Sequence, residues 1–283
     1  MHIRKLITLL YSKYHKKIGS DPVEQFANNG SKPWTFGYHE YKWKSIENHI
    51  HADFDSLIGT EKYGYRIDER IVELPWLLSR LDDRPGVMLD AGSALNFPVI
   101  LKHPKIRSKK LFISTLAYEG SACPELGVSY VYEDLRQTCF RENFFDIIAC
   151  ISTIEHIGMD NTFLYTSDIN KKEQNCEEYL PFLDVLRSRL KPGGKLYVSF
   201  PFGKACNHGW FQVLDAAMVD SLIKRFQPTV SQETIFYYSN DCWHVSTREE
   251  AAEAVCFDIN VQKKYESDYL AFSRSVVCLE LVK

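Results

Sequence analysis

The chain has 283 residues, of which 45% are apolar and 25% are charged, and its formal net charge is −3. This length and this apolar content predict a globular protein with one large α/β domain and an elaborated end, or with two small domains. A slightly acidic chain has no overall positive field to attract DNA or RNA, so a nucleic-acid partner is not expected.

The first 17 residues carry five lysines and arginines and no acidic side chain. Their apolar residues recur at helical spacing, which predicts an amphipathic helix with a basic face. We favour the interpretation that this helix packs against the rest of the protein or frays, and peripheral contact with the anionic inner face of a membrane is the alternative. The apolar run is too short for a signal peptide, and no window of the chain is long enough to span a membrane.

Residues 18–60 are polar and aromatic with weak periodicity, which is typical of an irregular lead-in or of a lid. We therefore predict two parts, an N-terminal segment over residues 1–60 and a main domain over residues 61–283. A helix is expected over residues 68–81, where the apolar side chains follow a helical period that Pro75 disturbs.

From residue 87 onward, short apolar runs alternate with helical segments. The runs cover residues 87–89, 111–113, 128–132, 147–151, 196–200 and 275–282. Helical periodicity falls between residues 179 and 190, and it returns after Asp215, which is a good N-cap. Thr247 with Glu250 forms a capping-box pattern. Strands that alternate with helices predict a mostly parallel sheet with helices on both faces, which is a three-layer α/β sandwich.

The eight cysteines are scattered, and none forms a Cys-x-x-Cys pair, which argues against a zinc site. Several stand inside apolar runs, as Cys150 does, where cysteine usually behaves as a small hydrophobic residue. We therefore expect reduced, buried thiols and a cytoplasmic protein. Glu155, His156 and Asp160 form only a weak candidate triad for a divalent cation, so no bound metal is predicted.

Polar and small residues follow several predicted strands at the point where each strand ends. Asp90 and Gly92 follow the first strand, Asp134 follows the third, and Glu155 with His156 follows the fourth. The carboxyl ends of parallel strands meet at one edge of a sheet, and ligands bind at that edge in open α/β folds. We therefore expect these groups to surround one crevice.

These motifs resemble those of class I, Rossmann-like S-adenosylmethionine-dependent methyltransferases, over about 200 residues from residue 87 to the C-terminus. Residues 87–96 resemble the family's first motif, a strand followed by Asp-x-Gly, and Asp134 stands where the family has an acid after its third strand. Residues 145–157 resemble the fourth strand and its Glu-His turn, and Lys-Pro-Gly-Gly at 191–194 resembles the turn into the fifth. The resemblance implies a seven-stranded, mostly parallel sheet with an antiparallel last strand, and it makes residues 61–283 a methyltransferase-like domain.

The resemblance also implies S-adenosylmethionine as the cofactor. Gly92 would let the backbone approach the methionine part, and Asp90 would favour the cationic sulfonium by its charge. Asp134 would accept a hydrogen bond from the adenine amine. Nine residues are the candidates for contact with the cofactor: Asp90, Gly92, Ser93, Ala94, Thr115, Leu116, Asp134, Leu135 and Ser152.

The chain departs from the family's pattern at three positions. Ala94 and Asn96 stand in place of the second and third glycines of the first motif. Thr115 stands where a carboxylate usually holds both ribose hydroxyls, and Glu119 follows four residues later. A catalytically silent, methyltransferase-like binding module is therefore one alternative. An NAD-dependent oxidoreductase is a second, although no Gly-x-Gly-x-x-Gly follows the first strand.

Two histidines are candidates for the chemistry. Methyl transfer to a hydroxyl needs an aligned acceptor and a base that removes its proton. His156 after the fourth strand is the first candidate base, and a capping role in its loop is the alternative interpretation. His208 is the second, in a segment where a histidine, Trp210 and an amide suit recognition of a sugar ring. We predict O-methylation of a small-molecule or glycan acceptor, as in members of the family associated with polysaccharide biosynthesis.

Overall fold

The structure is a computed structural model that describes residues 21–28, 32–118, 120–166, 168–259, 261–262 and 264–283. The predicted basic helix over residues 1–17 and Glu119 lie outside the described residues.

The chain forms two compact units. Unit 1 comprises Met1–Ser79, Tyr237–Val245 and Cys256–Arg274, and unit 2 comprises Arg80–Phe236, Ser246–Val255 and Ser275–Lys283. The predicted boundary at residue 60 falls inside unit 1.

The chain forms an eight-stranded sheet, of which all but the strand residues from Tyr237 to Val245 belongs to unit 2. In chain order its strands are β1 (Gly86–Ala91), β2 (Lys109–Thr115), β3 (Ser129–Tyr132), β4 (Phe145–Ile151), β5 (Leu190–Pro201), β8 (Val230–Ser239), β9 (Cys242–Ser246) and β10 (Ser275–Val282). The strands lie in the order β3-β2-β1-β4-β5-β10-β8-β9. β1 to β5 pair in parallel, and β10 pairs antiparallel with β5, for example Val277 with Phe200. The mostly parallel sheet with an antiparallel last strand is therefore confirmed.

The predicted number of seven strands is wrong by one. β8 and β9 are joined by Asn240 and Asp241, which both have positive φ angles, as a tight hairpin turn requires. This pair lacks the glycine that marks most two-residue hairpin turns, so the hairpin is not predicted from the sequence. Two further strands, β6 (Cys206–Asn207) and β7 (Gln212–Val213), form a small separate sheet.

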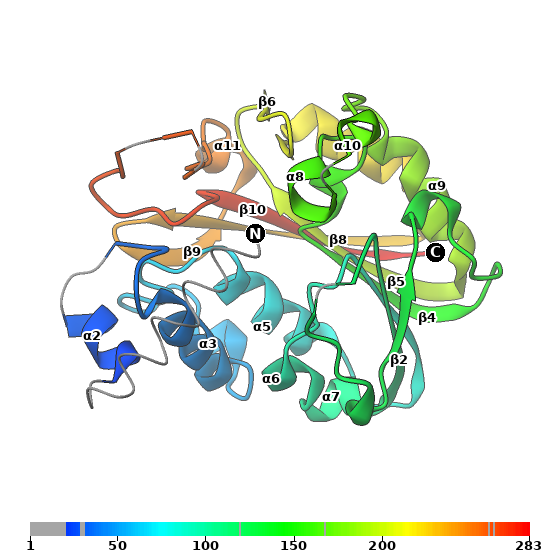
Figure 1. The fold of residues 1–283 in the computed structure, drawn as a ribbon, viewed down its shortest axis with the longest axis horizontal. Helices are drawn as coiled ribbons and strands as arrows, with labels where there is room; N and C mark the ends of the chain where they lie inside the picture. Colours follow the sequence, from blue (N-terminus) through cyan, green and yellow to red (C-terminus); the bar gives the residue numbers. More distant parts are fainter. Residues whose placement is uncertain (1–20, 29–31, 119, 167, 260, 263) are drawn as a thin grey trace. The chain divides into compact units, whose positions relative to one another are not determined.

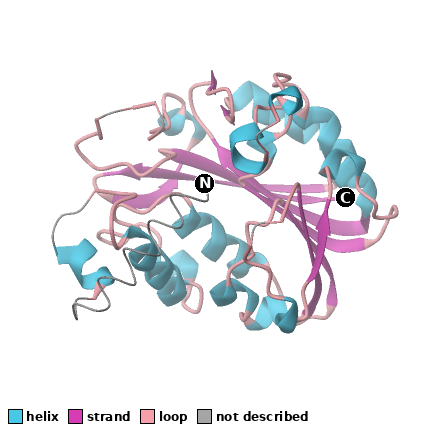
Figure 2. Ribbon diagram, in the orientation of Figure 1, coloured by secondary structure: helices cyan, strands magenta, loops and turns pink. Residues whose placement is uncertain are grey.

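Helices lie on both sides of the sheet within unit 2 (Figures 1 and 2). α6 (Pro98–Leu101) and α7 (Pro104–Arg107) lie on one side, and α9 (Tyr179–Arg189) and α10 (Ala216–Phe226) lie on the other. α10 begins as predicted, because the Asp215 carboxylate accepts a 2.9 Å bond from the Met218 amide. The shorter helical elements are α8 (Thr162–Tyr165), α11 (Arg248–Ala251), η1 (Pro124–Leu126), η2 (Leu135–Gln137), η3 (Ile154–His156) and η4 (Ile169–Lys171).

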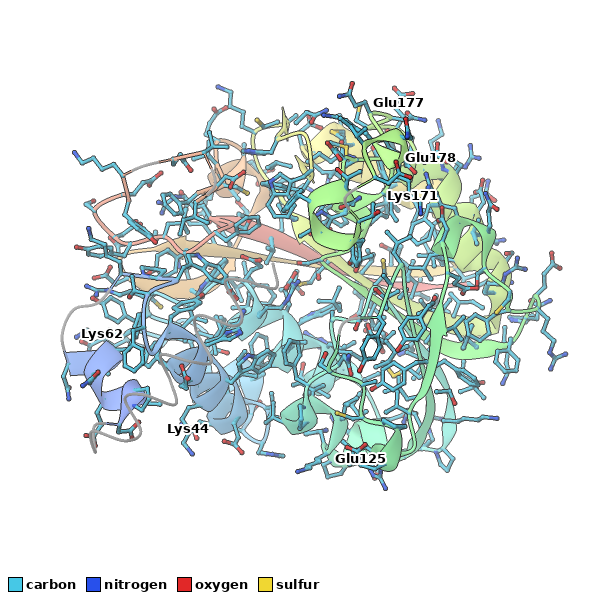
Figure 3. The ribbon with its side chains drawn as sticks, viewed as in Figure 1. Lys44, Lys62, Glu125, Lys171, Glu177 and Glu178 are labelled. Atoms are coloured by element: carbon cyan, nitrogen blue, oxygen red, sulfur yellow. The ribbon has the colours of Figure 1, made fainter. Side chains whose placement is uncertain are left out.

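The predicted cap of α11 is also present, with Thr247 and Glu250 bonded reciprocally. Exposed charged side chains such as Glu125, Lys171 and Glu177 extend from the outside of unit 2 (Figure 3). Of the eight cysteines, Cys150, Cys256 and Cys278 are buried. The expectation of buried thiols is wrong for the exposed ones, which are Cys139, Cys176 and Cys206.

Unit 1 contains four described helices. Three of them lie between residues 18 and 60, where an irregular lead-in is predicted, and the fourth is the helix predicted over residues 68–81. They are α2 (Pro22–Asn28), α3 (Tyr38–His49), α4 (Phe54–Leu57) and α5 (Arg70–Arg80, whose last residue belongs to unit 2). α3 buries Tyr38, Lys42 and Ile46, which are spaced four apart. A lysine in the middle of this buried stripe hid the helical period. Among the described residues, no helix has the length and apolar content of a membrane span.

Ionisable groups are buried together at the start of α5. The Asp68 carboxylate accepts bonds from Lys42 Nζ (2.6 Å) and from the Tyr38 hydroxyl (2.9 Å). Burial, together with the charges of Asp68 and Glu73, raises the pKa of the neighbouring Glu69 to about 8. Glu69 is therefore protonated at neutral pH in the folded protein, and its Oε2 accepts from the Ser273 amide at 3.2 Å.

This raised pKa predicts a pH dependence of stability. The folded chain keeps a proton on Glu69 between the ordinary value of 4.5 and about 8, whereas the unfolded chain releases it. Stability therefore falls as pH rises through this window. We expect Glu69→Gln, which stays neutral, to make that fall shallower in urea unfolding followed by tryptophan fluorescence. An unchanged slope, equal to that of the exposed control Glu61→Gln, would contradict the assignment.

Candidate functional site

The loop after β1 is held by a buried carboxylate. Asp90 is fully buried at the end of the strand, where its Oδ1 accepts from the Ala94 amide (3.2 Å) and its Oδ2 from the Leu95 amide (2.8 Å). These bonds satisfy two amides that the sharp turn would otherwise leave without partners. Asp90 thus fixes the shape of the loop. Because its carboxylate is buried, a ligand at the loop would feel its charge without direct contact.

Gly92 occupies the tightest position of the loop. Its φ is +114°, and its amide donates to the Ser114 carbonyl at the end of β2 (2.9 Å). A Cβ at this position would lie 2.0 Å from Oγ1 of Thr153, which follows β4. Only glycine fits both the φ angle and the contact. The close approach that the sequence assigned to the cofactor is therefore made by Thr153, 61 positions later.

Asn96, at the place of the third motif glycine, connects the loop to β3. Its Oδ1 accepts from the Tyr130 hydroxyl (2.9 Å), and that hydroxyl accepts from the Cys123 amide (2.7 Å). Ser93 and Ala94 are both buried. The bulkier residues thus have packing partners within the protein, and the backbone loop is kept without the two missing glycines.

The end of β2 presents no carboxylate among the described residues. Thr115 is buried, while Leu116 is exposed. Glu133 directly follows β3, and its carboxylate accepts from Ser114 Oγ (3.0 Å), Thr138 Oγ1 (2.6 Å) and the Cys139 amide (2.7 Å). Glu133, which the sequence did not single out, therefore joins the ends of β2 and β3.

Asp134 caps η2 and forms an ion pair with Arg136. Its Oδ1 accepts from the Arg136 amide (2.9 Å), and its Oδ2 accepts from Arg136 Nη2 (2.6 Å). The same guanidinium reaches Glu173 with bonds of 2.6 and 2.7 Å. Burial alone would raise the pKa of Asp134, but the bonds from Arg136 lower it, so the carboxylate is ionised. Leu135 beside it is buried.

The turn after β4 has a constrained backbone. Ser152 has a φ of +41°, which is uncommon for a residue other than glycine, and its amide donates to the Ser199 carbonyl of β5 (3.0 Å). Thr153 Oγ1 donates to the Ile151 carbonyl (3.1 Å) while it packs against Gly92. The turn therefore connects three strand ends and leads directly into η3.

His156, the last residue of η3, has a defined tautomer. Its Nδ1 lies 2.8 Å from the Trp210 carbonyl oxygen, and its ring stacks on the Trp210 indole at 5.2 Å. A carbonyl only accepts hydrogen bonds, so Nδ1 carries the hydrogen and the lone pair of the neutral ring is on Nε2. Nε2 lies 3.9 Å from Oε1 of the buried Glu155. The ring nitrogen that can take up a proton is therefore held in one orientation.

Aromatic rings pack against one side of His156 and against each other. Phe163 packs edge-on against Trp210 at 5.3 Å, and its side chain is 53% exposed. His208 stacks on the buried Phe211 at 4.3 Å with nearly parallel planes. Phe163, from α8, had no motif around it in the sequence. The cluster offers flat apolar faces beside a histidine, which is an arrangement that can bind a ring with an apolar face.

The structure thus places the predicted site residues at the carboxyl ends of β1 to β5, as expected for parallel strands. It links the β1 loop to the β4 turn through Gly92 and Thr153, and it links His156 to Trp210. Within the described residues, no group of three histidine, cysteine or acidic side chains is arranged to hold a metal ion.

The strand order, with antiparallel β10 between β5 and β8, defines an α/β, Rossmann-like fold of the methyltransferase type. No protein-family model and no curated protein sequence matches the chain. Similar solved structures include the Burkholderia thailandensis 1,6-didemethyltoxoflavin-N1-methyltransferase with bound S-adenosylhomocysteine, at 14% identity, 87% of this chain, 90% of that chain and a TM-score of 0.44. A possible histamine N-methyltransferase of Thermotoga maritima is 12% identical and covers 85% of this chain and 100% of its own, with a TM-score of 0.46. An N-methyltransferase of Bradyrhizobium japonicum in complex with S-adenosylhomocysteine is 14% identical and covers 86% of this chain and 98% of its own, with a TM-score of 0.43.

Proposed function

We propose that the chain is an S-adenosylmethionine-dependent methyltransferase that methylates a hydroxyl of a sugar or glycan intermediate. The observation that carries this proposal is the edge of the sheet where the β1 loop, Asp134 and His156 gather. The antiparallel β10 supports a methyltransferase over an NAD-dependent oxidoreductase.

The proposal also covers the acceptor and the location of the protein. The acceptor is a small molecule or glycan rather than a nucleic acid. The protein is cytoplasmic, with residues 1–17 in peripheral contact with the membrane.

The residues fit this cofactor in part. The ionised Asp134 and the buried Leu135 suit the adenine, provided that Arg136 releases one carboxylate oxygen. The positions for the ribose and the methionine part fit less well, because Thr115 is buried and Thr153 fills the space over Gly92. When bound, the cofactor supplies a methyl group on a cationic sulfur. The protein's own residues must then position the acceptor and take up its proton.

His156 is suited to take up that proton. With Nδ1 donating to the Trp210 carbonyl, the ring cannot turn away without losing a hydrogen bond, and Nε2 is left as the acceptor. A hydroxyl placed against Nε2 transfers its proton there. The charge that develops on the imidazole is then stabilised by the Glu155 carboxylate 3.9 Å away. Trp210 and Phe163 present apolar faces on which a sugar ring can stack.

A catalytically silent binding module is the second candidate, and two observations favour it. Thr153 occupies the space over Gly92, and Arg136 bonds both oxygens of Asp134. Calorimetric titration with S-adenosylhomocysteine and with NAD separates the candidates. We expect S-adenosylhomocysteine to bind and Asp134→Ala to weaken it strongly. Absence of binding at millimolar concentration would overturn the proposal, and binding of NAD alone would favour the oxidoreductase.

The assignment of the base has its own test. We expect His156→Gln to leave the affinity for S-adenosylhomocysteine unchanged and to lower turnover about a hundredfold, because a general base contributes 10²–10⁴-fold. Turnover is measured as the transfer of a labelled methyl group to a panel of free and phosphorylated hexoses. His208→Gln, in which the ring stacked on Phe211 is replaced, is the comparison. Equal losses in the two variants would contradict the distinct role of His156.

A further inference from the structure

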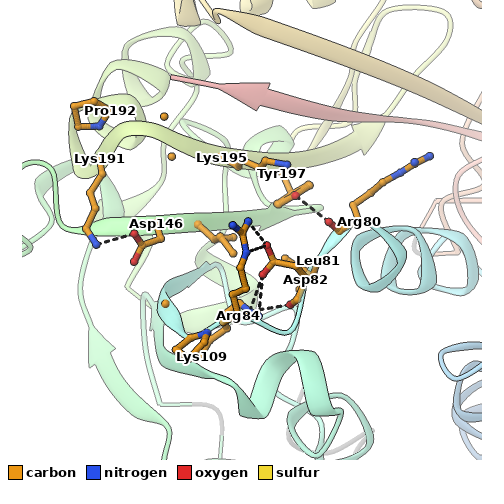
Figure 4. A pocket seen from close by; sticks show the side chains of 15 residues that line it. Arg80, Leu81, Asp82, Arg84, Lys109, Asp146, Lys191, Pro192, Lys195 and Tyr197 are labelled. Carbon is orange, nitrogen blue, oxygen red and sulfur yellow. Dashed lines mark hydrogen bonds and ion pairs between the residues drawn. The ribbon is translucent and has the colours of Figure 1, made fainter.

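A pocket of about 330 Å³ lies at the amino ends of the strands (Figure 4). It lies wholly within unit 2, against the starts of β1, β4 and β5 and against the segment from Arg80 to Gly86. β4 pairs in parallel with both β1 and β5. The length of the strands, about 20 Å for six residues, therefore separates this pocket from the polar turns at the carboxyl edge.

The walls of the pocket carry more basic than acidic side chains. The basic ones are Arg80, Arg84, Lys109, Lys191 and Lys195, and the acidic ones are Asp82 and Asp146. Glu280, which is not part of the lining, pairs with Lys195 at 2.5 Å. When this pair is included, five basic and three acidic side chains lie in or next to the wall of the pocket.

Both acidic side chains in the wall are used by the protein. Asp146 accepts from the Val87 amide (2.8 Å) and from Lys191 Nζ (2.7 Å), one bond on each oxygen. Asp82 accepts from the amide and from Nε of Arg84 at 3.1 and 2.7 Å. The bonds from Arg84 lower the pKa of Asp82, and those from Lys191 and Val87 outweigh burial to lower the pKa of Asp146. These carboxylates stay ionised and serve the structure.

The basic side chains keep unused donors. An ammonium has three N–H donors and a guanidinium has five. Among the described residues, Lys191 uses one donor with Asp146 and Lys195 uses one with Glu280, and both lysine side chains are 41% exposed. Arg84 uses Nε and Nη2 with Asp82. The side chains with surplus donors line the pocket, and the bonds to the acids in its wall do not use all of these donors.

Lys109 has a different role. Its side chain is buried, and its Nζ donates to the carbonyls of Asp82 (2.8 Å) and Arg84 (2.5 Å) and to Ser108 Oγ (3.0 Å). It therefore holds the turn that carries Arg84 in place. At the other side of the pocket, Gly193 leaves open space, because a Cβ there would meet nothing within 4 Å.

We propose that this pocket binds the phosphate groups of a small phosphorylated ligand, at a site separate from the one proposed for methyl transfer. Phosphate oxygens only accept hydrogen bonds, so they match surplus donors from two lysines and an arginine. The volume is at the lower end for small-molecule sites, which favours a diphosphate or a phosphorylated monosaccharide over a polymer. A soluble metabolite and a lipid headgroup both offer this chemistry.

The first test is a calorimetric titration of the full-length chain with sodium diphosphate at constant ionic strength. We expect binding that the double variant Arg84→Gln/Lys191→Gln weakens at least about tenfold, because it removes two charges with free donors. The matched control Lys204→Gln/Lys224→Gln removes two exposed charges elsewhere and should change the affinity less than about twofold. No binding at millimolar diphosphate, or equal weakening by both double variants, would overturn the proposal.

Two further measurements complete the test. The single variant Arg84→Gln, at a side chain that is 82% exposed, keeps the test valid if the double variant does not fold. Flotation with phosphatidic acid or phosphatidylcholine vesicles distinguishes the sources of phosphate. Binding of diphosphate without co-flotation indicates a soluble ligand, and co-flotation with phosphatidic acid that diphosphate reverses indicates a headgroup. Co-flotation that diphosphate reverses but the double variant does not reduce would contradict a role of the pocket, because the membrane contact proposed for residues 1–17 does not involve it.

Discussion

Gly92→Ala should lower the free energy of unfolding of unit 2 by about 3 kcal/mol or more, because two costs add. The first is the backbone φ of +114°, which residues other than glycine rarely adopt. The second is steric, since the new Cβ would lie 2.0 Å from Oγ1 and 2.5 Å from Cγ2 of Thr153. Urea unfolding followed by circular dichroism measures the loss, and S-adenosylhomocysteine binding should be lost with it.

Gly193→Ala is the matched control for this prediction. Gly193 also has a positive φ, +74°, but a Cβ there would meet nothing within 4 Å, so only the backbone cost of about 1 kcal/mol remains. Thr153→Ala removes the two closest atoms and should restore part of the stability when combined with Gly92→Ala. Similar losses for Gly92→Ala and Gly193→Ala, without rescue by Thr153→Ala, would show that the contact with Thr153 does not constrain the loop.

The contact between Gly92 and Thr153 illustrates what the sequence alone predicts of this fold. The apolar runs marked the parallel strands because strands buried on both faces must be apolar over their whole length. The polar residues after them then fell at one edge by topology alone. The Asp215 and Thr247 caps were predicted because capping is a local property of the chain.

The roles of individual side chains at that edge were less predictable. Arg136 bonds Asp134 from two residues away, but whether it does so depends on rotamers that no sequence pattern encodes. His156 meets the Trp210 carbonyl across 54 positions, so its tautomer could only follow from the tertiary structure. The location of the site at one edge of the sheet was therefore predictable, whereas the hydrogen-bond partners of its side chains were not.

Unit 1 shows the same limit in its buried charges. A buried lysine is stable only if a tertiary partner compensates its charge, and the partner of Lys42 in α3 is Asp68, 26 positions later. A helical period interrupted by a lysine resembles a polar, irregular segment when the sequence is considered alone. The pairing makes that lysine part of the buried face of the helix. The helix and its ion pair therefore had to be recognised together.

Lys42→Met should lower the free energy of unfolding of unit 1 by about 3–5 kcal/mol, because it leaves the Asp68 carboxylate buried without its cation. Lys42 Nζ lies 2.6 Å from Asp68 Oδ2, and the two side chains are 8% and 2% exposed. Four of the five tryptophans, Trp34, Trp43, Trp76 and Trp243, belong to unit 1, so tryptophan fluorescence in urea follows this unit. Methionine keeps the length of the side chain, so the loss reports the charge.

The control is Lys44→Met on the same helix, at a 59% exposed lysine whose surface pair with Glu47 spans 3.7 Å, and it should cost less than about 0.5 kcal/mol. The pH dependence provides a second criterion. In the native protein burial raises the pKa of Asp68, but Lys42, Arg70 and the Tyr38 hydroxyl together lower it below its usual value, so this contribution to stability is lost as pH falls through that lowered value. Without Lys42, burial dominates and raises the pKa, so the variant should instead regain stability on acidification. Parallel pH profiles for the variant and the native chain would show that Lys42 does not compensate Asp68.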